Sequence, residues 1–169
     1  MVLPVTLDDA KRQLKIIGND DDAEINDFIL DAAGWVEGYT GHLLEQRQVT
    51  ERFGSFERIR LGSWPIAAET VTVTHAGVAI DGARLSSVTR PAGLLPAVNG
   101  AWPMVSTGDV IEVTYSAGYA DPASVPREIR RAMLILIAAY DADREGREIV
   151  QQAEQTARNL CRRLKSWSV

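Results

Sequence analysis

Apolar residues follow two different spacings along this chain. Near both ends they recur at steps of three and four residues, the period of one helix face, and in the middle they alternate with polar residues, the period of a strand. The pattern therefore predicts an α+β fold, with a mainly helical core built from an N-terminal and a C-terminal helix pair and an inserted antiparallel β region. We expect residues 1–45 and 120–169 to form the helical core and residues 46–119 to form the β region.

Two helices are predicted at the start of the chain. Thr6 suits an N-cap that accepts a hydrogen bond from the Asp9 amide, and Gly18-Asn19 marks the end of this helix. Asp20-Asp21-Asp22 marks the start of the second helix, because acidic side chains are favourable in a first turn, and Thr40-Gly41 marks its end. The predicted core-facing positions are Leu7, Ala10, Leu14 and Ile17, then Ile25, Phe28, Ile29, Ala32, Val36 and Tyr39.

The middle of the chain is predicted to form strands. The clearest is Thr70-Val71-Thr72-Val73-Thr74, in which valines and threonines alternate. Further strands are expected in residues 48–53, 58–61, 85–88 and 110–115, and Asp81-Gly82 is typical of a hairpin turn. Residues 91–104 hold three prolines and two glycines, so we expect a loop there, anchored by Trp102.

Two further helices are predicted at the end of the chain. Pro126 suits a helix start, where its missing amide costs little. The uninterrupted apolar run over residues 133–140 indicates burial on most sides, so this helix should be the central one, and Gly146 would separate it from the last helix. The predicted core positions are Ile129, Met133, Leu136, Ile137 and Tyr140, then Ile149, Ala153, Ala157, Leu160, Leu164 and Trp167.

Length and charge narrow the class of protein. The 169 residues fit one domain, or one domain with an insert. A net charge of -5 disfavours wholesale nucleic-acid binding, since neutralising phosphates needs a basic excess. Cys161 is the single cysteine, so no intrachain disulfide is expected. The first residues lack the features of a signal peptide and no apolar run is long enough for a bilayer, so we expect a soluble protein made and used in a cytoplasm.

No residue set predicts a catalytic, cofactor-binding or metal-binding site. His42 follows a helix-ending glycine and is expected in a solvated loop, and His75 ends a strand. Neither stands in a metal-ligand spacing, and the three aspartates at 20–22 lack the further oxygens of a calcium loop. Cys161 lies near several cations that could lower its thiol pKa, but a half-buried packing role is the favoured interpretation.

The two ends of the chain carry opposite charge. Acids dominate the first two helices: Asp8, Asp9, Asp20, Asp21, Asp22, Glu24, Asp27, Asp31 and Glu37. Bases dominate the last segment: Arg158, Arg162, Arg163 and Lys165. One interpretation is simple compensation of helix dipoles, and the other is complementary surfaces between copies or partners. Trp167 either covers the core of the domain or serves as a binding anchor.

The order of several short motifs resembles the phage head–tail connector (adaptor) family, which includes relatives in prophages and gene transfer agents. The motifs are Val5-Thr6-Leu7-Asp8-Asp9-Ala10-Lys11, Asp21-Asp22-Ala23-Glu24-Ile25, Glu37-Gly38-Tyr39-Thr40-Gly41-His42-Leu43-Leu44, Val113-Thr114-Tyr115-Ser116-Ala117-Gly118-Tyr119 and Val125-Pro126-Arg127-Glu128-Ile129. They span nearly the whole chain, and the weakest matches are residues 47–104 and 146–169.

The resemblance implies a structural protein of the virion neck, made in the host cytoplasm. Such adaptors form a ring of copies under the portal protein, extend the DNA channel and carry a stopper or tail-completion protein, and their C-terminal tail docks on the portal. The implied portal-docking residues here are Arg158, Leu160, Arg162, Arg163, Leu164, Lys165 and Trp167. The implied channel or inter-subunit acids are Asp20, Asp21, Asp22, Glu24, Asp27 and Asp31. DNA would pass without sequence-specific contacts, and the β region would lie at the periphery or toward the tail.

Two other functions compete with this interpretation. One is a stopper or tail-completion protein of the same neck. The other, from a different class, is a small hydrolase with its site in the β region, which would need a pocket of convergent titratable groups. The resemblance favours a non-enzymatic connector without cofactor, metal or membrane partner.

Overall fold

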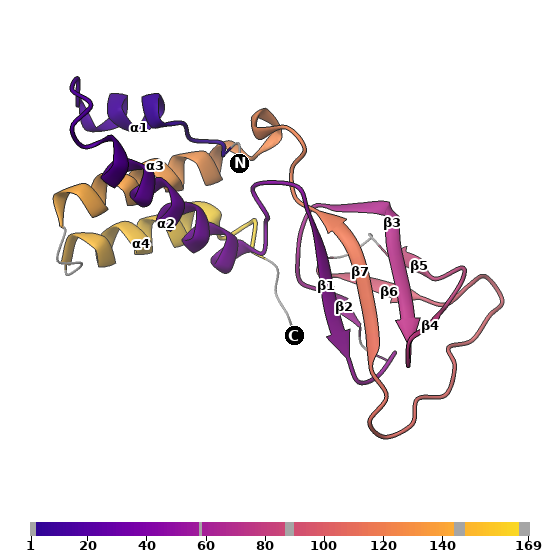
Figure 1. Cartoon of the computed structure of the whole chain (residues 1–169). Helices are drawn as coiled ribbons and strands as arrows, with labels where there is room; N and C mark the ends of the chain where they lie inside the picture. The colour runs from indigo at the N-terminus through magenta and orange to yellow at the C-terminus, as the bar shows by residue number, and fades with distance from the viewer. Residues whose placement is uncertain (1–2, 58, 87–89, 144–147, 166–169) are drawn as a thin grey trace. The chain divides into compact units, whose positions relative to one another are not determined.

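The computed structural model describes residues 3–57, 59–86, 90–143 and 148–165, and it confirms the α+β class (Figure 1). The chain divides into two compact units. The helical unit comprises residues 1–45 and 119–165, and the β unit comprises residues 46–118. No helix within the described ranges is long and apolar enough to cross a membrane.

The helical unit holds four α-helices and one short 3₁₀ helix. Their bounds are α1 Leu7–Leu14, α2 Asp22–Thr40, η1 Pro122–Ser124, α3 Arg127–Ala142 and α4 Glu148–Cys161. Helix α3 packs against α1, α2 and α4, so the central position predicted for it is confirmed (Figure 1). Its Met133, Leu136 and Ile137 side chains are completely buried, and burying each contributes about 1.5–3 kcal/mol relative to exposure.

The caps of the first helix pair show how local sequence sets the helix bounds. Thr6 and Asp9 form a capping box, in which each side chain accepts a hydrogen bond from the backbone amide of the other residue, as predicted for Thr6. Helix α2 begins after Asp21, which makes no side-chain cap, and ends at Gly41, whose φ of 73° suits glycine.

The predicted end of the first helix is wrong. Helix α1 ends at Leu14, because Lys15 adopts a left-handed conformation with φ 62° and its amide bonds to the Lys11 carbonyl. The chain then turns Ile16 toward the core and leaves Ile17 97% exposed, so Ile17 is not a core residue. Gly18-Asn19 therefore lies in the loop between the helices.

The β unit contains two antiparallel sheets. Its strands are β1 Arg47–Phe53, β2 Arg60–Leu61, β3 Ile66–His75, β4 Val78–Ala79, β5 Arg84–Ser86, β6 Ala92–Leu95 and β7 Ile111–Ala117. One sheet has the order β1-β7-β3-β4 and the other the order β2-β6-β5. In β7, Ile111, Val113, Tyr115 and Ala117 are buried and alternate with half-buried residues, which is the expected period of two.

Two expectations for the β unit are wrong. The hairpin turn between β3 and β4 is Ala76-Gly77, whereas Asp81-Gly82 joins strands of different sheets. The segment expected as a loop contains strand β6, whose Ala92, Gly93 and Leu94 are buried. Pairing with β2 and β5 supplies the ladder that decides this strand, and the local pattern of residues 91–104 does not indicate this pairing.

The face of α4 differs from the predicted one in its first and last positions. Ala153, Ala157 and Cys161 are buried, Leu160 and Leu164 pack at the edge of the core, and Ile149 is 48% exposed. Ile149 stands on the first turn of α4, and it is not a core residue. Gly146 and Trp167, predicted as break and anchor, lie outside the described residues.

Candidate assembly surfaces

The basic segment, residues 158–165, folds back onto two aromatic rings of α2. The Trp35 and Tyr39 rings stack with centroids 5.3 Å apart. The Arg158 guanidinium lies 5.8 Å from the Trp35 ring centre and the Lys165 ammonium 4.9 Å from that of Tyr39, within cation–π range. Arg158 also pairs with Glu154 at 2.8 Å, and the Tyr39 hydroxyl donates to its carbonyl at 3.4 Å. Two predicted docking cations thus already have partners within the chain.

The other predicted docking residues differ in exposure. Arg162 and Arg163 are exposed, in the turn that follows α4. Leu160 and Leu164 are half-buried against the helical core. Trp167 lies outside the described residues. The aromatic pair Trp35 and Tyr39 was not predicted as part of this surface, although its spacing of four residues places both rings on one helix face.

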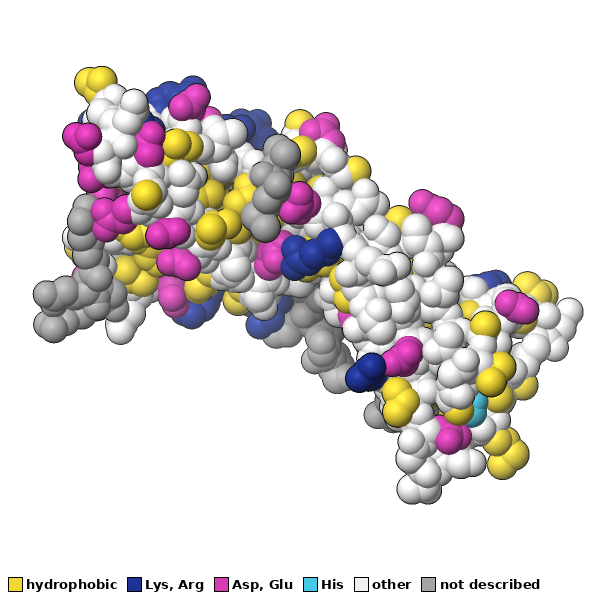
Figure 2. Space-filling model, in the orientation of Figure 1, with side chains coloured by type: hydrophobic (Ala, Val, Ile, Leu, Met, Phe, Trp, Pro, Cys, Tyr) yellow, Lys and Arg dark blue, Asp and Glu magenta, His cyan; other side chains and the backbone are white. Residues whose placement is uncertain are grey.

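The predicted acidic residues fall into two groups. Asp22 forms an ion pair with Lys11 at 2.6 Å and Glu24 is half-buried, so both belong to the packing of the helical unit. Asp20, Asp21, Asp27 and Asp31 are exposed. Figure 2 shows acidic side chains lying among exposed hydrophobic ones on the visible face of the helical unit. The structure thus leaves four of the six acids available to solvent or to a partner.

Asp9 connects the start of α1 to α3. Its carboxylate pairs with Arg130 at 2.9 Å and with Arg12 at 3.1 Å, besides accepting from the Thr6 amide. Burial acts to raise the pKa of Asp9, but the hydrogen bonds with Thr6 and the guanidinium groups of Arg130 and Arg12 together lower it below its usual value. This residue stabilises the helical unit in its ionised form.

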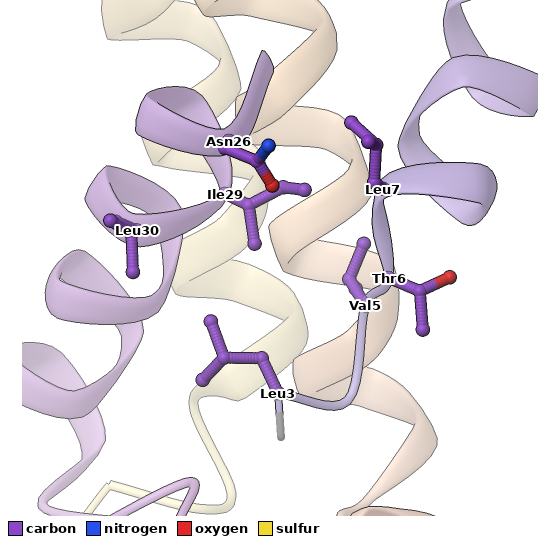
Figure 3. A pocket seen from close by; sticks show the side chains of 7 residues that line it. All are labelled: Leu3, Val5, Thr6, Leu7, Asn26, Ile29 and Leu30. Carbon is purple, nitrogen blue, oxygen red and sulfur yellow. The ribbon is translucent and has the colours of Figure 1, made fainter. Parts of the chain in front are cut away.

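An apolar groove lies between the N-terminal stretch and α2. It is lined by Leu3, Val5, Thr6, Leu7, Asn26, Ile29 and Leu30 and has a volume of about 340 Å³. Figure 3 shows leucine and valine side chains of the N-terminal stretch on one side and Ile29 and Leu30 of α2 on the other. The sequence pattern did not predict this groove. A groove depends on how closely two elements pack in the folded chain, and here the N-terminal stretch and α2 leave a space between them.

His42 is a buried residue, so the expectation of a solvated loop is wrong. Its side chain is 2% exposed and its Nδ1 lies 2.7 Å from the Tyr119 hydroxyl, with the two rings stacked. The Tyr119 amide also donates to the Leu43 carbonyl at 3.3 Å. His42 and Tyr119 therefore join the two chain segments of the helical unit where the β unit begins and ends.

Cys161 is inert packing rather than a reactive thiol. It is completely buried on α4, and burial, with a smaller contribution from Glu128, raises its pKa to about 11. The alternative in which nearby cations lower this pKa is therefore wrong. The packing interpretation holds, with more complete burial than expected.

A polar network lies inside the β unit. The Tyr115 hydroxyl donates to the Glu51 carboxylate and accepts from the Ser63 amide at 3.3 Å, and Glu51 also accepts from the Gly62 amide at 3.0 Å. Burial, together with the Glu51 carboxylate, raises the pKa of Tyr115. The network ties β1 and β7 to the turn before β3, and its hydrogen bonds satisfy the buried hydroxyl.

The second histidine fastens a long loop of the β unit. His75 Nε2 lies 3.0 Å from Asp109 Oδ2, and this carboxylate oxygen also accepts from the Ser106 amide at 2.8 Å. Beside it, Phe56 stacks on Trp102 with centroids 4.5 Å apart, so the predicted anchoring by Trp102 is confirmed. These contacts indicate that His75 and Asp109 have a structural role in holding the loop in place.

The described residues were searched for groups that could bind a metal ion or react. They contain no group of three or more side chains that could hold a metal ion. Burial raises the pKa of the Tyr115 and Tyr140 hydroxyls and of the Cys161 thiol, and of these residues Tyr115 and Cys161 are completely buried. Grooves, exposed charges and stacked aromatics are features by which proteins bind other proteins.

The fold is similar to that of chains in three solved structures of gene transfer agent particles. It is similar to a chain in "Neck of empty GTA particle computed with C6 symmetry", with a TM-score of 0.73 and 19% identity over 98% of this chain and 91% of that one. A chain of "Virion of native gene transfer agent (GTA) particle" gives 0.73 and 21% over 100% and 94%. A chain of "Neck of native GTA particle computed with C12 symmetry" gives 0.66 and 23% over 88% and 85%.

The sequence comparison points to the same class. Residues 4–57 match the family described as phage gp6-like head-tail connector protein. This confirms the connector resemblance over α1, α2 and β1, the segment that holds three of the five motifs. No curated protein matches the sequence.

Proposed function

We propose that this chain is a structural head–tail connector of a tailed phage or phage-like particle, located in the neck of the virion. The observation that carries the proposal is the connector-family match of residues 4–57. The fold, shared with GTA neck components over 98% of the chain, supports it. In this role the chain contributes binding surfaces, and the assembled particle uses them to join head to tail.

The connector works as a ring. The similar structures were computed with sixfold and twelvefold symmetry, which supports a cyclic arrangement of copies. A cyclic ring is built from heterologous contacts, so each copy must present two unlike faces to its neighbours. The opposite charge of the two chain ends is consistent with such unlike faces.

The portal protein is the proposed head-side partner. Arg162 and Arg163 are exposed beside the half-buried Leu160 and Leu164, which combines cations with an apolar edge. Arginine and apolar anchors are frequent at the centres of protein interfaces. A stopper or tail-completion protein is the proposed tail-side partner. Exposed acids such as Asp27 and Asp31, facing the channel, would repel DNA and let it slide without specific contacts.

Electron microscopy of the chain mixed with its cognate portal tests the proposal. We expect a ring of copies seated on the portal and continuing its channel. A chain that binds only at the tail end of the neck would instead be a stopper, and a chain that binds neither component would contradict the proposal.

The docking residues need point variants, because removing residues 158–169 would also remove the buried Cys161 and the packed Leu160. Replacing both exposed arginines, Arg162→Glu with Arg163→Glu, should weaken portal binding by tenfold or more, on the order of 1.4 kcal/mol. Arg131→Glu, an exposed change on α3, is the matched control and should bind normally. Equal binding by all variants would remove the basic segment from the portal contact.

A further inference from the structure

The four cations of the basic segment, residues 158–165, have two kinds of surroundings. Arg158 and Lys165 lie over aromatic rings of α2, whereas the two arginines between them in the chain are exposed. We propose that Trp35 and Tyr39 are positioning residues for the portal contact: they bind the two outer cations and so hold the turn after α4, and the two inner arginines make the contact. The inference rests on the proposed function, and it removes Arg158 and Lys165 from the direct portal contacts.

The inner arginines, Arg162 and Arg163, stand in a turn that is fastened on both sides. Before them, the Cys161 side chain is completely buried in the helical core. After them, the amides of Leu164 and Lys165 both donate to the Cys161 carbonyl, at 2.9 and 3.2 Å, and Leu164 packs against the same core. The direction in which the two guanidinium groups point therefore depends on how firmly the end of this turn is held.

Lys165 holds the end of the turn against α2. Its ammonium lies 4.9 Å from the centre of the Tyr39 ring, and both side chains are half-buried. An ammonium is attracted to the electron-rich face of an aromatic ring, and at a partly exposed site this changes an equilibrium by a factor of about two to five. Loss of the ring removes this attachment, so the turn should open more often.

Arg158 joins the start of the basic segment to the same rings. Its guanidinium lies 5.8 Å from the Trp35 ring centre and pairs with Glu154, one helical turn earlier, at 2.8 Å. The Tyr39 hydroxyl donates to the Arg158 carbonyl at 3.4 Å. Tyr39 therefore contacts both ends of the segment, with its hydroxyl at the start and its ring under the Lys165 ammonium at the end.

A turn that is already formed is a better docking element than a flexible one. Backbone and side chains that become ordered on binding lower the affinity, and a turn held before binding avoids part of this cost. The apparent affinity falls in proportion to the fraction of copies in which the turn has the competent shape. The aromatic pair should therefore affect portal binding without touching the portal.

A double-mutant cycle, measured by titrating the full chain on its cognate portal, tests this assignment. Tyr39→Leu and Lys165→Met should each weaken portal binding about two- to fivefold. The double variant should bind no more weakly than either single variant, because both changes remove the same contact. Tyr39→Phe, which keeps the ring, should recover most of the binding that Tyr39→Leu loses.

Phe28→Leu is the matched control for Tyr39→Leu. Phe28 is also a half-buried ring of α2 packed against the core, but its ring lies 6.1 Å from that of Tyr140. Its loss should disturb the core without weakening portal binding. An equal loss of binding from Phe28→Leu and Tyr39→Leu would show a general folding defect and would overturn the inference.

Amide hydrogen exchange in the free chain gives a readout that does not need the portal. Tyr39→Leu should speed exchange of the Leu164 and Lys165 amides about two- to fivefold, because these amides close the turn. Phe28→Leu should leave their exchange unchanged. Unchanged exchange in Tyr39→Leu would contradict the role of this ring in holding the turn.

The binding data separate the inference from the proposed function. Additive losses from Tyr39→Leu and Lys165→Met would mean that Lys165 contacts the portal itself, and the inference would be wrong. A loss from Arg162→Glu with Arg163→Glu but none from Tyr39→Leu would leave the docking proposal intact and overturn the inference alone. A wild-type chain that does not bind the portal would overturn both.

Discussion

In the helical unit the buried side chains form one continuous aliphatic cluster, with ion pairs such as Asp9–Arg130 toward its surface. In the β unit a tyrosine hydroxyl and a glutamate carboxylate are hydrogen-bonded beneath the strands, and stacked aromatic rings hold the long loop. The stability of the helical unit depends mainly on how well its core volume is filled, so substitutions at the edge of the cluster should have small effects. The second arrangement depends on directional bonds, in which the loss of one partner leaves another group unsatisfied.

The largest expected effect is in the aliphatic cluster. Leu136→Ala removes a completely buried side chain from α3 and should lower the free energy of unfolding of the helical unit by about 2–5 kcal/mol. Leu30→Ala, at a 49% exposed position, is the control and should cost much less. Amide hydrogen exchange in each unit measures the change, and equal losses from both variants would contradict the assigned core.

The polar network of the β unit should respond next. Tyr115→Phe keeps the ring but leaves the Glu51 carboxylate and the Ser63 amide without the hydroxyl, and we expect a loss of about 1–3 kcal/mol. Thr50→Val, which removes an exposed hydrogen bond to Thr114, should change stability by under about 0.5 kcal/mol. Hydrogen exchange of β7 is the readout. If Tyr115→Phe left the free energy of unfolding unchanged, the hydrogen bonds of this network would not stabilise the β unit beyond the packing of the aromatic ring.

Two glycines, one inside α2 and one at its C-cap, should behave in opposite ways. Gly34→Ala should stabilise the isolated chain by about 0.5–1 kcal/mol, because the helix gains and nothing obstructs the methyl group. Gly41→Ala should destabilise it by about 1 kcal/mol, because φ is 73° at this helix end. Thermal unfolding compares the two.

The smallest effect concerns pH. The pKa of Asp9 is lowered in the folded chain, so its contribution is present above the unfolded value near 3.9 and is lost as the pH falls through the folded pKa. Asp9→Asn should cost roughly 0.5–1 kcal/mol at pH 7. This difference from wild type should shrink below about pH 4, where both side chains are neutral. Denaturant midpoints measured from pH 3 to pH 7 would reveal a constant difference if the ion pairs with Arg130 and Arg12 were irrelevant.

The helical unit was largely predictable because its signals are local. The Thr6 cap, the Gly41 stop and the periodic apolar face of α2 all depend on neighbours within one or two turns. The error at the end of α1 arose because Lys15 takes the left-handed conformation that the sequence suggested for the glycine three residues later. The apolar run over residues 133–140 correctly predicted the central position of α3. Because α1, α2 and α4 all pack against this helix, little of its surface is left exposed.

The β unit and the surfaces were less predictable. Strand β6 was not predicted because the three prolines in residues 91–104 favour a loop. Its pairing with β2 and β5 forms only in the folded chain and leaves no local signal. The basic residues near the end of the chain were evident from the sequence, but their contacts with the rings of Trp35 and Tyr39 were not. The groove and the exposure of Ile17 also required coordinates, because both depend on what a side chain fails to contact.

The amino-acid order was enough to establish the α+β class, the helix pairs at both ends, the uneven charge and the connector resemblance. A helix closes its hydrogen bonds within four residues, so its sequence carries most of the information for its position. Folding in three dimensions decided that β7 lies between β1 and β3, that His42 is buried against Tyr119, and that Ile17 is exposed in the loop after α1. Strand partners, burial and grooves arise from residues far apart in the chain, and only their meeting in the fold creates them.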